Sequence, residues 1–194
     1  MCTQGAPGND ETHMSFPLWR GARTGTPRFF VPLLVSLLAV GACDWPGRPG
    51  NRPLAYTYES PEQLARAVLE ALEARDAAAL RRLALTEQEF GDHVWPSLPA
   101  ARPERNLPLS YVWGDLHQKS EAFLATTLTG LGGRRLTLRQ VSFTGGTTDY
   151  GPFKVHRKSQ LTVRDDDGTD RHLRVFGSVL EQGGRFKVFS YVVD

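Results

Sequence analysis

The chain has 194 residues, of which 40% are hydrophobic and 23% are charged, and this composition and length favour a globular protein with one hydrophobic core. The formal net charge is +2; three of the 23 basic and two of the 21 acidic side chains precede Cys43, which leaves 20 and 19 after it. This near-neutral balance argues against a nucleic-acid-binding protein, because binding to phosphates needs a clustered basic face.

The segment before Cys43 has the organisation of an export signal. Arg20, Arg23 and Arg28 lead into an uncharged stretch over residues 29–42. This stretch is short for a transmembrane helix and typical of the core of a signal peptide. We expect residues 1–42 to be removed, with Met14 as a candidate for the true start because residues 2–13 do not resemble the beginning of a signal peptide. If they are removed, Cys43 is the last cysteine of the chain and no intramolecular disulfide can form.

The apolar stretch ends in Val40, Gly41, Ala42 and Cys43, with small residues directly before a cysteine. This motif resembles the lipobox of bacterial lipoproteins, in which the cysteine is acylated and becomes the new N-terminus. The resemblance implies lipid on Cys43, the membrane as a partner and a location in the bacterial cell envelope. Asp44 resembles an inner-membrane retention signal of enterobacteria, but that rule depends on the lineage, so the choice between inner and outer membrane stays open. The alternative, a buried helix or uncleaved anchor that ends in cysteine, does not account for the small residues.

The residues after Cys43 predict a tether followed by one domain. From Asp44 to Tyr58 there is no apolar periodicity, and proline and glycine oppose both helix and sheet. The residues concerned are Pro46, Gly47, Pro49, Gly50 and Pro53. We therefore assign 43–58 to the lipidated cysteine and tether, and 59–194 to a single domain.

The first half of this domain predicts helices with defined starts. Ser60 as N-cap, Pro61 at the first helical position and Gln63 placed to close a capping box with Ser60 predict a helix N-terminus, and apolar residues continue at helical spacing to about Ala74. Asp76 is placed to cap a second, short helix whose inward face is Leu80, Leu83 and Ala84.

A capping box over 86–89 opens a short turn that Pro96 ends. Residues 96–109 hold four prolines and predict an ordered loop. A longer helix is expected over 110–131, with one apolar stripe that ends at Gly132 and Gly133. The stripe consists of Val112, Leu116, Phe123, Leu124, Leu128 and Leu131.

The remainder of the chain predicts four antiparallel strands. Apolar residues alternate within 136–143, 153–163, 173–179 and 186–193, and a change of phase near Arg139 indicates a bulge. Helices that precede strands in this way indicate an α+β domain. The predicted turns contain glycine: Gly145 and Gly146, Asp167 and Gly168, and Gly183 and Gly184.

The sequence from Leu69 to Leu83, LEALEARDAAALRRL, resembles the opening helix pair of the nuclear-transport-factor-two-like superfamily, also called SnoaL-like or cystatin-like. The resemblance implies N-terminal helices packed on a curved antiparallel sheet that forms a cone around a long helix. The chain departs from the family in having no predicted strand between the short helices and the long one. Because the superfamily includes cyclases, isomerases, dehydratases and non-catalytic binding modules, the resemblance leaves the function undecided.

Residues 110–119 form the densest cluster of functional side-chain types. Trp113 and His117 share one face of the expected helix, and Asp115 and Lys119 form another pair four residues apart. One interpretation makes His117 or Asp115 an acid or base at the mouth of the cone, with Trp113 against a ligand. The other, which we favour, is a histidine beside a tryptophan and a solvated ion pair.

Arg157 and Ser159 interrupt an otherwise apolar row in the expected strand 153–163. If this row lines a cone, the Arg157 guanidinium could bind a carboxylate or phosphate, with Tyr150 nearby. A bulge that turns Arg157 outward, or an acidic partner such as Glu89 or Asp115, would make it structural instead.

No metal or cofactor signature is found in the sequence. The spacings of His93, His117, His156 and His172 match no paired-ligand pattern. The run Asp165–Gly168 has its glycine too early for a calcium loop and predicts a hairpin turn. We also find no nucleophile elbow, catalytic cysteine or phosphate loop, and we expect no cofactor.

Three functions stay open at this level. The leading hypothesis is a lipid-anchored, non-enzymatic envelope protein that binds a small ligand or a partner protein. The first alternative is a cyclase, isomerase or dehydratase that uses Asp115 or His117 as base and Arg157 as anion anchor. The second is a structural assembly subunit. Convergence of His117, Arg157 and Tyr150 in one pocket would favour the enzyme, whereas a cavity filled by phenylalanine (Phe123, Phe153 and Phe176) would argue against it.

Overall fold

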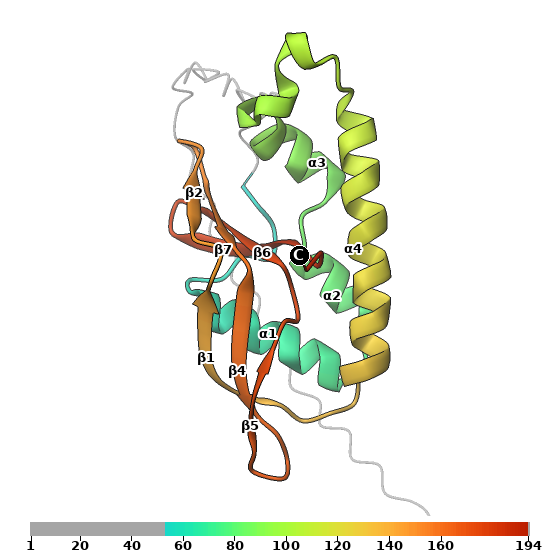
Figure 1. Cartoon of the computed structure of the whole chain (residues 1–194), viewed down its shortest axis with the longest axis vertical. Helices are drawn as coiled ribbons and strands as arrows, with labels where there is room; N and C mark the ends of the chain where they lie inside the picture. Colours follow the sequence, from blue (N-terminus) through green and yellow to red (C-terminus); the bar gives the residue numbers. More distant parts are fainter. Residues whose placement is uncertain (1–52, 194) are drawn as a thin grey trace, which may run out of the picture. The chain divides into compact units, whose positions relative to one another are not determined.

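The structure is a computed structural model that describes residues 53–193. Cys43, the expected signal peptide and most of the expected tether lie outside the described residues. The described part begins with helices and continues into two antiparallel sheets (Figure 1). The predicted α+β class is therefore confirmed.

The first helices begin at the caps that the sequence predicts. In α1 (Pro61–Glu73) the Ser60 hydroxyl accepts a hydrogen bond from the Gln63 amide at 3.2 Å, although the Gln63 side chain accepts from the amide of Glu59 and not from that of Ser60. In α2 (Ala77–Leu83) the Asp76 carboxylate accepts from the Ala79 amide at 2.8 Å. Such bonds satisfy amides that have no partner inside the helix, which fixes the start of each helix locally.

The expected turn and loop after Leu85 contain more helix than the sequence indicates. The capping box of Thr86 and Glu89 forms and opens α3 (Glu87–Glu89). A five-residue π-helix, η1 (Phe90–Val94), and three single 3₁₀ turns follow before the long helix: η2 (Trp95–Ser97), η3 (Pro99–Ala101) and η4 (Pro103–Arg105). Each 3₁₀ turn has proline in its first two positions, where the missing amide proton is not needed. The predicted ordered loop over 96–109 thus consists largely of single 3₁₀ turns that begin at or next to proline.

The long helix α4 (Leu109–Leu131) covers two separate groups of apolar side chains. Its first half, with Val112 and Leu116, packs against a cluster that includes Phe90, Phe153 and Leu180. Its second half packs against the larger cluster around α1 through Phe123, Leu124, Leu128 and Leu131. The predicted apolar stripe is thus confirmed along the whole helix.

The strands form two sheets. The first has the order β1-β4-β5, from β1 (Thr137–Phe143), β4 (Ser159–Arg164) and β5 (Asp170–Leu173). The second has the order β2-β3-β6-β7, from β2 (Thr147–Asp149), β3 (Lys154–Arg157), β6 (Ser178–Gln182) and β7 (Arg185–Ser190). The pairing of β1 with β4 shifts between Leu138 and Gln140, which confirms the predicted bulge.

Two of the four predicted strands are wrong, because each is divided between the two sheets. The segment 153–163 becomes β3 and β4, separated by Lys158 in the left-handed region (φ 56°). This residue resets the alternation, so Arg157 is exposed while Ser159 is buried and donates a hydrogen bond to the Phe176 carbonyl. The segment 173–179 is likewise divided into β5 and β6 around Gly177.

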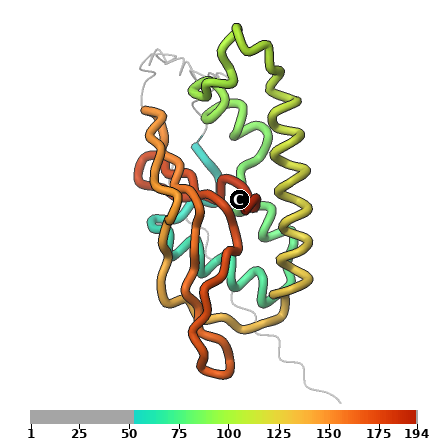
Figure 2. The backbone as a smooth tube through the Cα atoms, in the orientation of Figure 1, coloured from blue at the N-terminus to red at the C-terminus, as the bar shows by residue number. Residues whose placement is uncertain are grey.

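Helix α1 contacts β1 of the first sheet and β7 of the second, and in Figure 2 it crosses the described part behind the strands while α4 runs along one side. Helix α1 thus packs against both sheets. Among the described residues, no helix is both long enough and apolar enough to cross a bilayer.

The last residues that we assign to the tether are docked on the domain. Tyr58 exchanges two backbone hydrogen bonds with Phe186 of β7, at 2.9 and 2.8 Å, and Leu54 packs on the Phe90 cluster. Residues 54–58 thus belong to the folded unit, although the sequence assigns them to the tether.

Candidate ligand-binding cleft

A cleft of about 320 Å³ lies between α4, the segment from Ala84 to Glu87, and the residues that end and follow β7. Its volume is within the range of sites that bind small molecules. The side chains around it come from four places in the sequence: Arg81; Ala84, Leu85, Thr86 and Glu87; Trp113, Leu116, His117, Ser120 and Glu121; and Phe189, Ser190 and Tyr191.

Apolar and polar side chains are both present in this cleft. Leu85, Leu116 and Phe189 supply apolar surface, and Leu85 is itself part of the core. Tyr191 is buried; its hydroxyl donates to the Leu80 carbonyl at 2.7 Å and its amide donates to the Ser120 hydroxyl at 3.0 Å. Burial raises the pKa of the Tyr191 hydroxyl above its ordinary value, so it stays protonated at neutral pH. Tyr191 is thus a fixed part of the wall and not a general base.

Trp113 and His117 come together at the cleft, as expected from their spacing. Their rings stack at 5.5 Å with an interplanar angle of 16°, and the other neighbour of Trp113 is Phe90 at 5.4 Å. His117 is exposed, whereas Trp113 is half-buried. Asp115 is exposed and pairs with Lys119 at 2.7 Å. These contacts are the arrangement that we favour from the sequence, a histidine beside a tryptophan and a solvated ion pair.

The arginine of the cleft already has a carboxylate partner. The Arg81 guanidinium donates from Nε to both oxygens of Glu121, at 2.9 and 3.2 Å. Both side chains are partly exposed, so the pair stabilises the fold little. It does reduce the positive charge that an anionic ligand would meet.

The structure does not bring Arg157 or Tyr150 to this cleft. Arg157 is exposed at the end of β3, and its Nη2 donates to the Thr148 hydroxyl at 2.7 Å. Tyr150 stacks on Phe153 at 5.0 Å, and neither residue lines the cleft. Phe153 and Phe176 are buried in the two core clusters, and Phe123 packs against one of them. The convergence of His117, Arg157 and Tyr150 that would favour an enzyme is absent from the described residues.

The sequence interpretation missed the fully buried charge at Lys187. Its ammonium donates to the carbonyl of Ala55 at 2.6 Å, to the carbonyl of Arg82 at 3.3 Å and to the Glu89 carboxylate at 3.1 Å. Burial lowers the pKa of Lys187 in spite of this carboxylate. The sequence does contain one indication of this burial. Phe189 lies two residues after Lys187 on the same side of β7, and an apolar residue there predicts that this side of the strand is buried.

Glu89 holds this buried cation in place. Burial opposes its charge, but hydrogen bonds from the Thr86 and Ala55 amides, together with Lys187, outweigh burial and leave the pKa of Glu89 below its ordinary value. Because Ala55 contributes both a donor to Glu89 and an acceptor for Lys187, the pair clasps the start of the described chain to α3 and β7.

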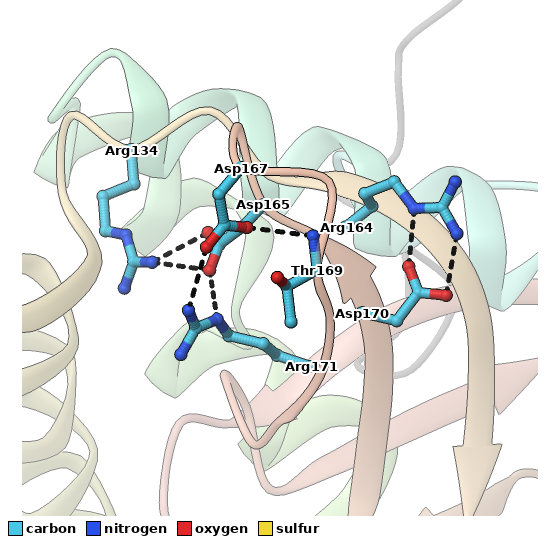
Figure 3. A network of polar contacts seen from close by, with 7 residues as sticks. All are labelled: Arg134, Arg164, Asp165, Asp167, Thr169, Asp170 and Arg171. Carbon is cyan, nitrogen blue, oxygen red and sulfur yellow. Dashed lines mark hydrogen bonds and ion pairs between the residues drawn. The ribbon is translucent and has the colours of Figure 1, made fainter.

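The acidic run after β4 forms the predicted hairpin turn. The Asp165 amide donates to the Thr169 carbonyl, and Gly168 has a positive φ of 81°. Asp165 is nearly buried and pairs with Arg134, at 2.7 Å, and with Arg171, while Asp170 pairs with Arg164 (Figure 3). The contact with Arg134 links the hairpin to the segment after α4. Arginine side chains are thus the ion-pair partners of this acidic run.

His156 lies in a second polar group on β3, where Nδ1 is 2.8 Å from the Thr147 hydroxyl and Nε2 is 2.8 Å from Glu181. Its ring packs at 4.9 Å from that of Phe143. The order hydroxyl, imidazole and carboxylate is that of a nucleophile with its base, but these residues do not line the cleft. We interpret the group as a cross-strand ladder between β2, β3 and β6.

Comparisons of the chain with protein-family models, with curated proteins and with solved structures found no match. The site is therefore interpreted from its own geometry and chemistry. Within residues 53–193, no group of three or more His, Cys, Asp or Glu side chains is placed to hold a metal ion.

Proposed function

We propose that this protein is a lipid-anchored component of the bacterial cell envelope whose domain binds a small ligand in the cleft between α4 and the end of β7. The observation that carries the ligand-binding role is the cleft itself, which combines the size of a small-molecule site with an apolar floor and hydrogen-bonding side chains. The anchoring role is carried by the lipobox-like sequence that ends at Cys43.

The chemistry of the cleft favours a ligand with an apolar body and one polar end. Leu85, Leu116 and Phe189 would cover the apolar part, and the Ser120 hydroxyl, which accepts from the Tyr191 amide and can still donate, would bind the polar end. Glu87, in contrast, has no ion-pair partner among residues 53–193, and Arg81 is paired with Glu121. The cleft is thus better suited to a neutral or cationic polar group than to an anion.

Replacing the candidate lipidated cysteine tests the anchor. In the producing bacterium we expect wild-type protein to partition with membranes and to incorporate labelled fatty acid, and Cys43→Ser to incorporate none, because serine offers no thiol for acylation. Fatty-acid labelling followed by intact-mass measurement checks this. Equal labelling of the two proteins, or a wild type without acyl mass, would contradict the lipoprotein proposal.

Ligand binding is tested by filling the cleft. Leu116→Trp places a larger side chain in the cleft, whereas Gln118→Trp adds the same side chain at an exposed position of α4 outside it. We expect a compound that is extracted from wild type and Gln118→Trp, each purified from detergent-solubilised native membranes, to be at least about tenfold depleted in Leu116→Trp. Mass spectrometry of the extracts is the measurement. Equal recovery from all three proteins, or no enriched compound in any, would refute the ligand role.

A further inference from the structure

The described residues expose three large apolar side chains, namely Tyr56, Leu107 and Tyr111. Tyr111 is 68% exposed and Leu107 is 41% exposed, and they lie four residues apart where η4 leads into α4. We call residues 98–111 the tip. In Figures 1 and 2 it is the turn at which the chain passes from the short helices to α4.

Two arginines, with the exposed Glu104 between them, precede these apolar side chains in the tip. Arg102 and Arg105 are exposed, and neither forms an ion pair or a side-chain hydrogen bond within residues 53–193. Four prolines in and beside the tip (Pro96, Pro99, Pro103 and Pro108) restrict its backbone. A stiff turn with an exposed tyrosine, an exposed leucine and two arginines is the combination found where proteins meet the headgroup region of a bilayer.

The tip and the start of the described chain belong to the same part of the domain. Leu54 packs on the apolar cluster that also contains Leu98 of the tip and Val112, the neighbour of Tyr111. Pro53 and Ala55 share a hollow with Asp92 and His93 of η1, which leads into the tip. The described chain therefore starts beside the helical turns that lead into the tip.

The short chain between Cys43 and Pro53 limits how far the start of the described chain can lie from a membrane that holds Cys43. Nine residues separate Cys43 from Pro53, and a chain of that length spans at most about 35 Å. A bilayer held so close has a high effective concentration, so a weak contact is sufficient for docking.

From these observations we propose that the tip docks on an anionic lipid surface, with Leu107 and Tyr111 at the headgroups and Arg102 and Arg105 paired with lipid phosphates. The docking rests on the lipid anchor proposed above. It directs the domain so that the start of the described chain at Pro53 and the tip face the bilayer together.

Site-specific fluorescence on the lipidated protein in vesicles tests the docking. The processed chain would have no free thiol, so a cysteine introduced by Ser110→Cys is labelled alone, next to Tyr111. Ala125→Cys is the matched control, because it is also exposed on α4 and lies about 22 Å further along the helix. In phosphatidylglycerol vesicles that contain a nitroxide lipid, we expect quenching of a dye at position 110 to exceed that at 125 by about threefold or more.

Variants of the tip separate docking from anchoring. We expect two double variants to reduce the quenching of a dye at position 110 to the level at position 125: Leu107→Asp with Tyr111→Asp, and Arg102→Glu with Arg105→Glu. The control variant Arg139→Glu, on β1, should leave the quenching at position 110 unchanged. All these proteins should still float with the vesicles. Flotation with equal quenching at 110 and 125, in phosphatidylglycerol as in phosphatidylcholine, would overturn the docking alone; a wild type that neither floats nor has acyl mass would overturn the anchor and the docking with it.

Discussion

At the scale of single residues, Lys187 and Glu89 determine how the start of the described chain is held. An ammonium group without exposure to water is tolerated only when each of its protons has an acceptor. Lys187 has three acceptors, two of which are carbonyls of Ala55 and Arg82, distant in sequence. The pair is therefore a clasp between segments and not a surface ion pair.

Removal of this cation should be costly. We expect Lys187→Ala to lower the free energy of unfolding by about 3 kcal/mol, because Glu89 is left in a poorly solvated place without its partner. Lys119→Ala, which removes an exposed lysine paired with Asp115, should change it by at most about 0.5 kcal/mol. Urea unfolding of the two variants is the measurement, and similar losses for both would contradict the clasp.

The same pair predicts an acid-sensitive fold. The pKa of Glu89 is lower in the folded chain than its ordinary value of 4.5, so its contribution to stability is fully present above that value and is lost as the pH falls through the folded-state pKa. Glu89→Gln should be less stable than wild type at pH 7 but should lose less stability between pH 5 and about pH 3. Thermal unfolding followed by circular dichroism measures this. The exposed Glu104→Gln should keep the wild-type slope, and an identical slope in Glu89→Gln would exclude the assignment.

At the scale of elements, the division of two predicted strands between two sheets depends on single positions. Lys158 takes a left-handed conformation between β3 and β4. Gly177, between β5 and β6, lies so close to Val192 that a Cβ atom would overlap the Val192 carbonyl oxygen. Its amide and carbonyl also bond to Ser190 and Ser159, so the backbone cannot easily move away.

Alanine substitutions distinguish this packed glycine from a free one. Gly177→Ala should destabilise the fold by about 2–3 kcal/mol, because backbone has to shift to admit the methyl group. Gly114→Ala, in α4 with open space around its Cβ position, should stabilise it by about 0.5–1 kcal/mol, because alanine favours helix. Thermal or urea unfolding should show changes of opposite sign in the free energy of unfolding. No change for Gly177→Ala would contradict this prediction and would mean that the backbone at Val192 moves away at little cost.

At the scale of the whole molecule, the candidate cleft lies beside the hollow lined by the first described residues. Thr86 contributes to the cleft and also to the hollow lined by Pro53 and Ala55. A protein anchored through Cys43 and docked by its tip would thus hold its cleft close to the membrane surface. This placement would suit a ligand that leaves or enters the bilayer, which agrees with the mixture of apolar and polar side chains around the cleft.

The sequence by itself determined the α+β class, the helix starts at Ser60, Asp76 and Thr86, the apolar stripe of α4 and the bulge near Arg139. The helix starts depend on side chains three residues apart, so local chemistry is sufficient for them. The class, the stripe and the bulge follow from the period of the apolar residues along the chain. It also supplied the stacking of Trp113 on His117, since residues four apart share a helix face.

Only the tertiary structure decided which strands pair, where Arg157 points and what surrounds Lys187. The alternation of apolar residues does not reveal that a chain leaves one sheet for another at Lys158, because the change is fixed by pairing with β1 and β6. Likewise, the sequence predicts that a lysine in a strand is exposed. Lys187 is buried because Ala55, Arg82 and Glu89, all about 100 residues or more earlier in the chain, accept hydrogen bonds from its ammonium group. The cleft arises in the same way, from side chains up to 110 residues apart that meet only after folding.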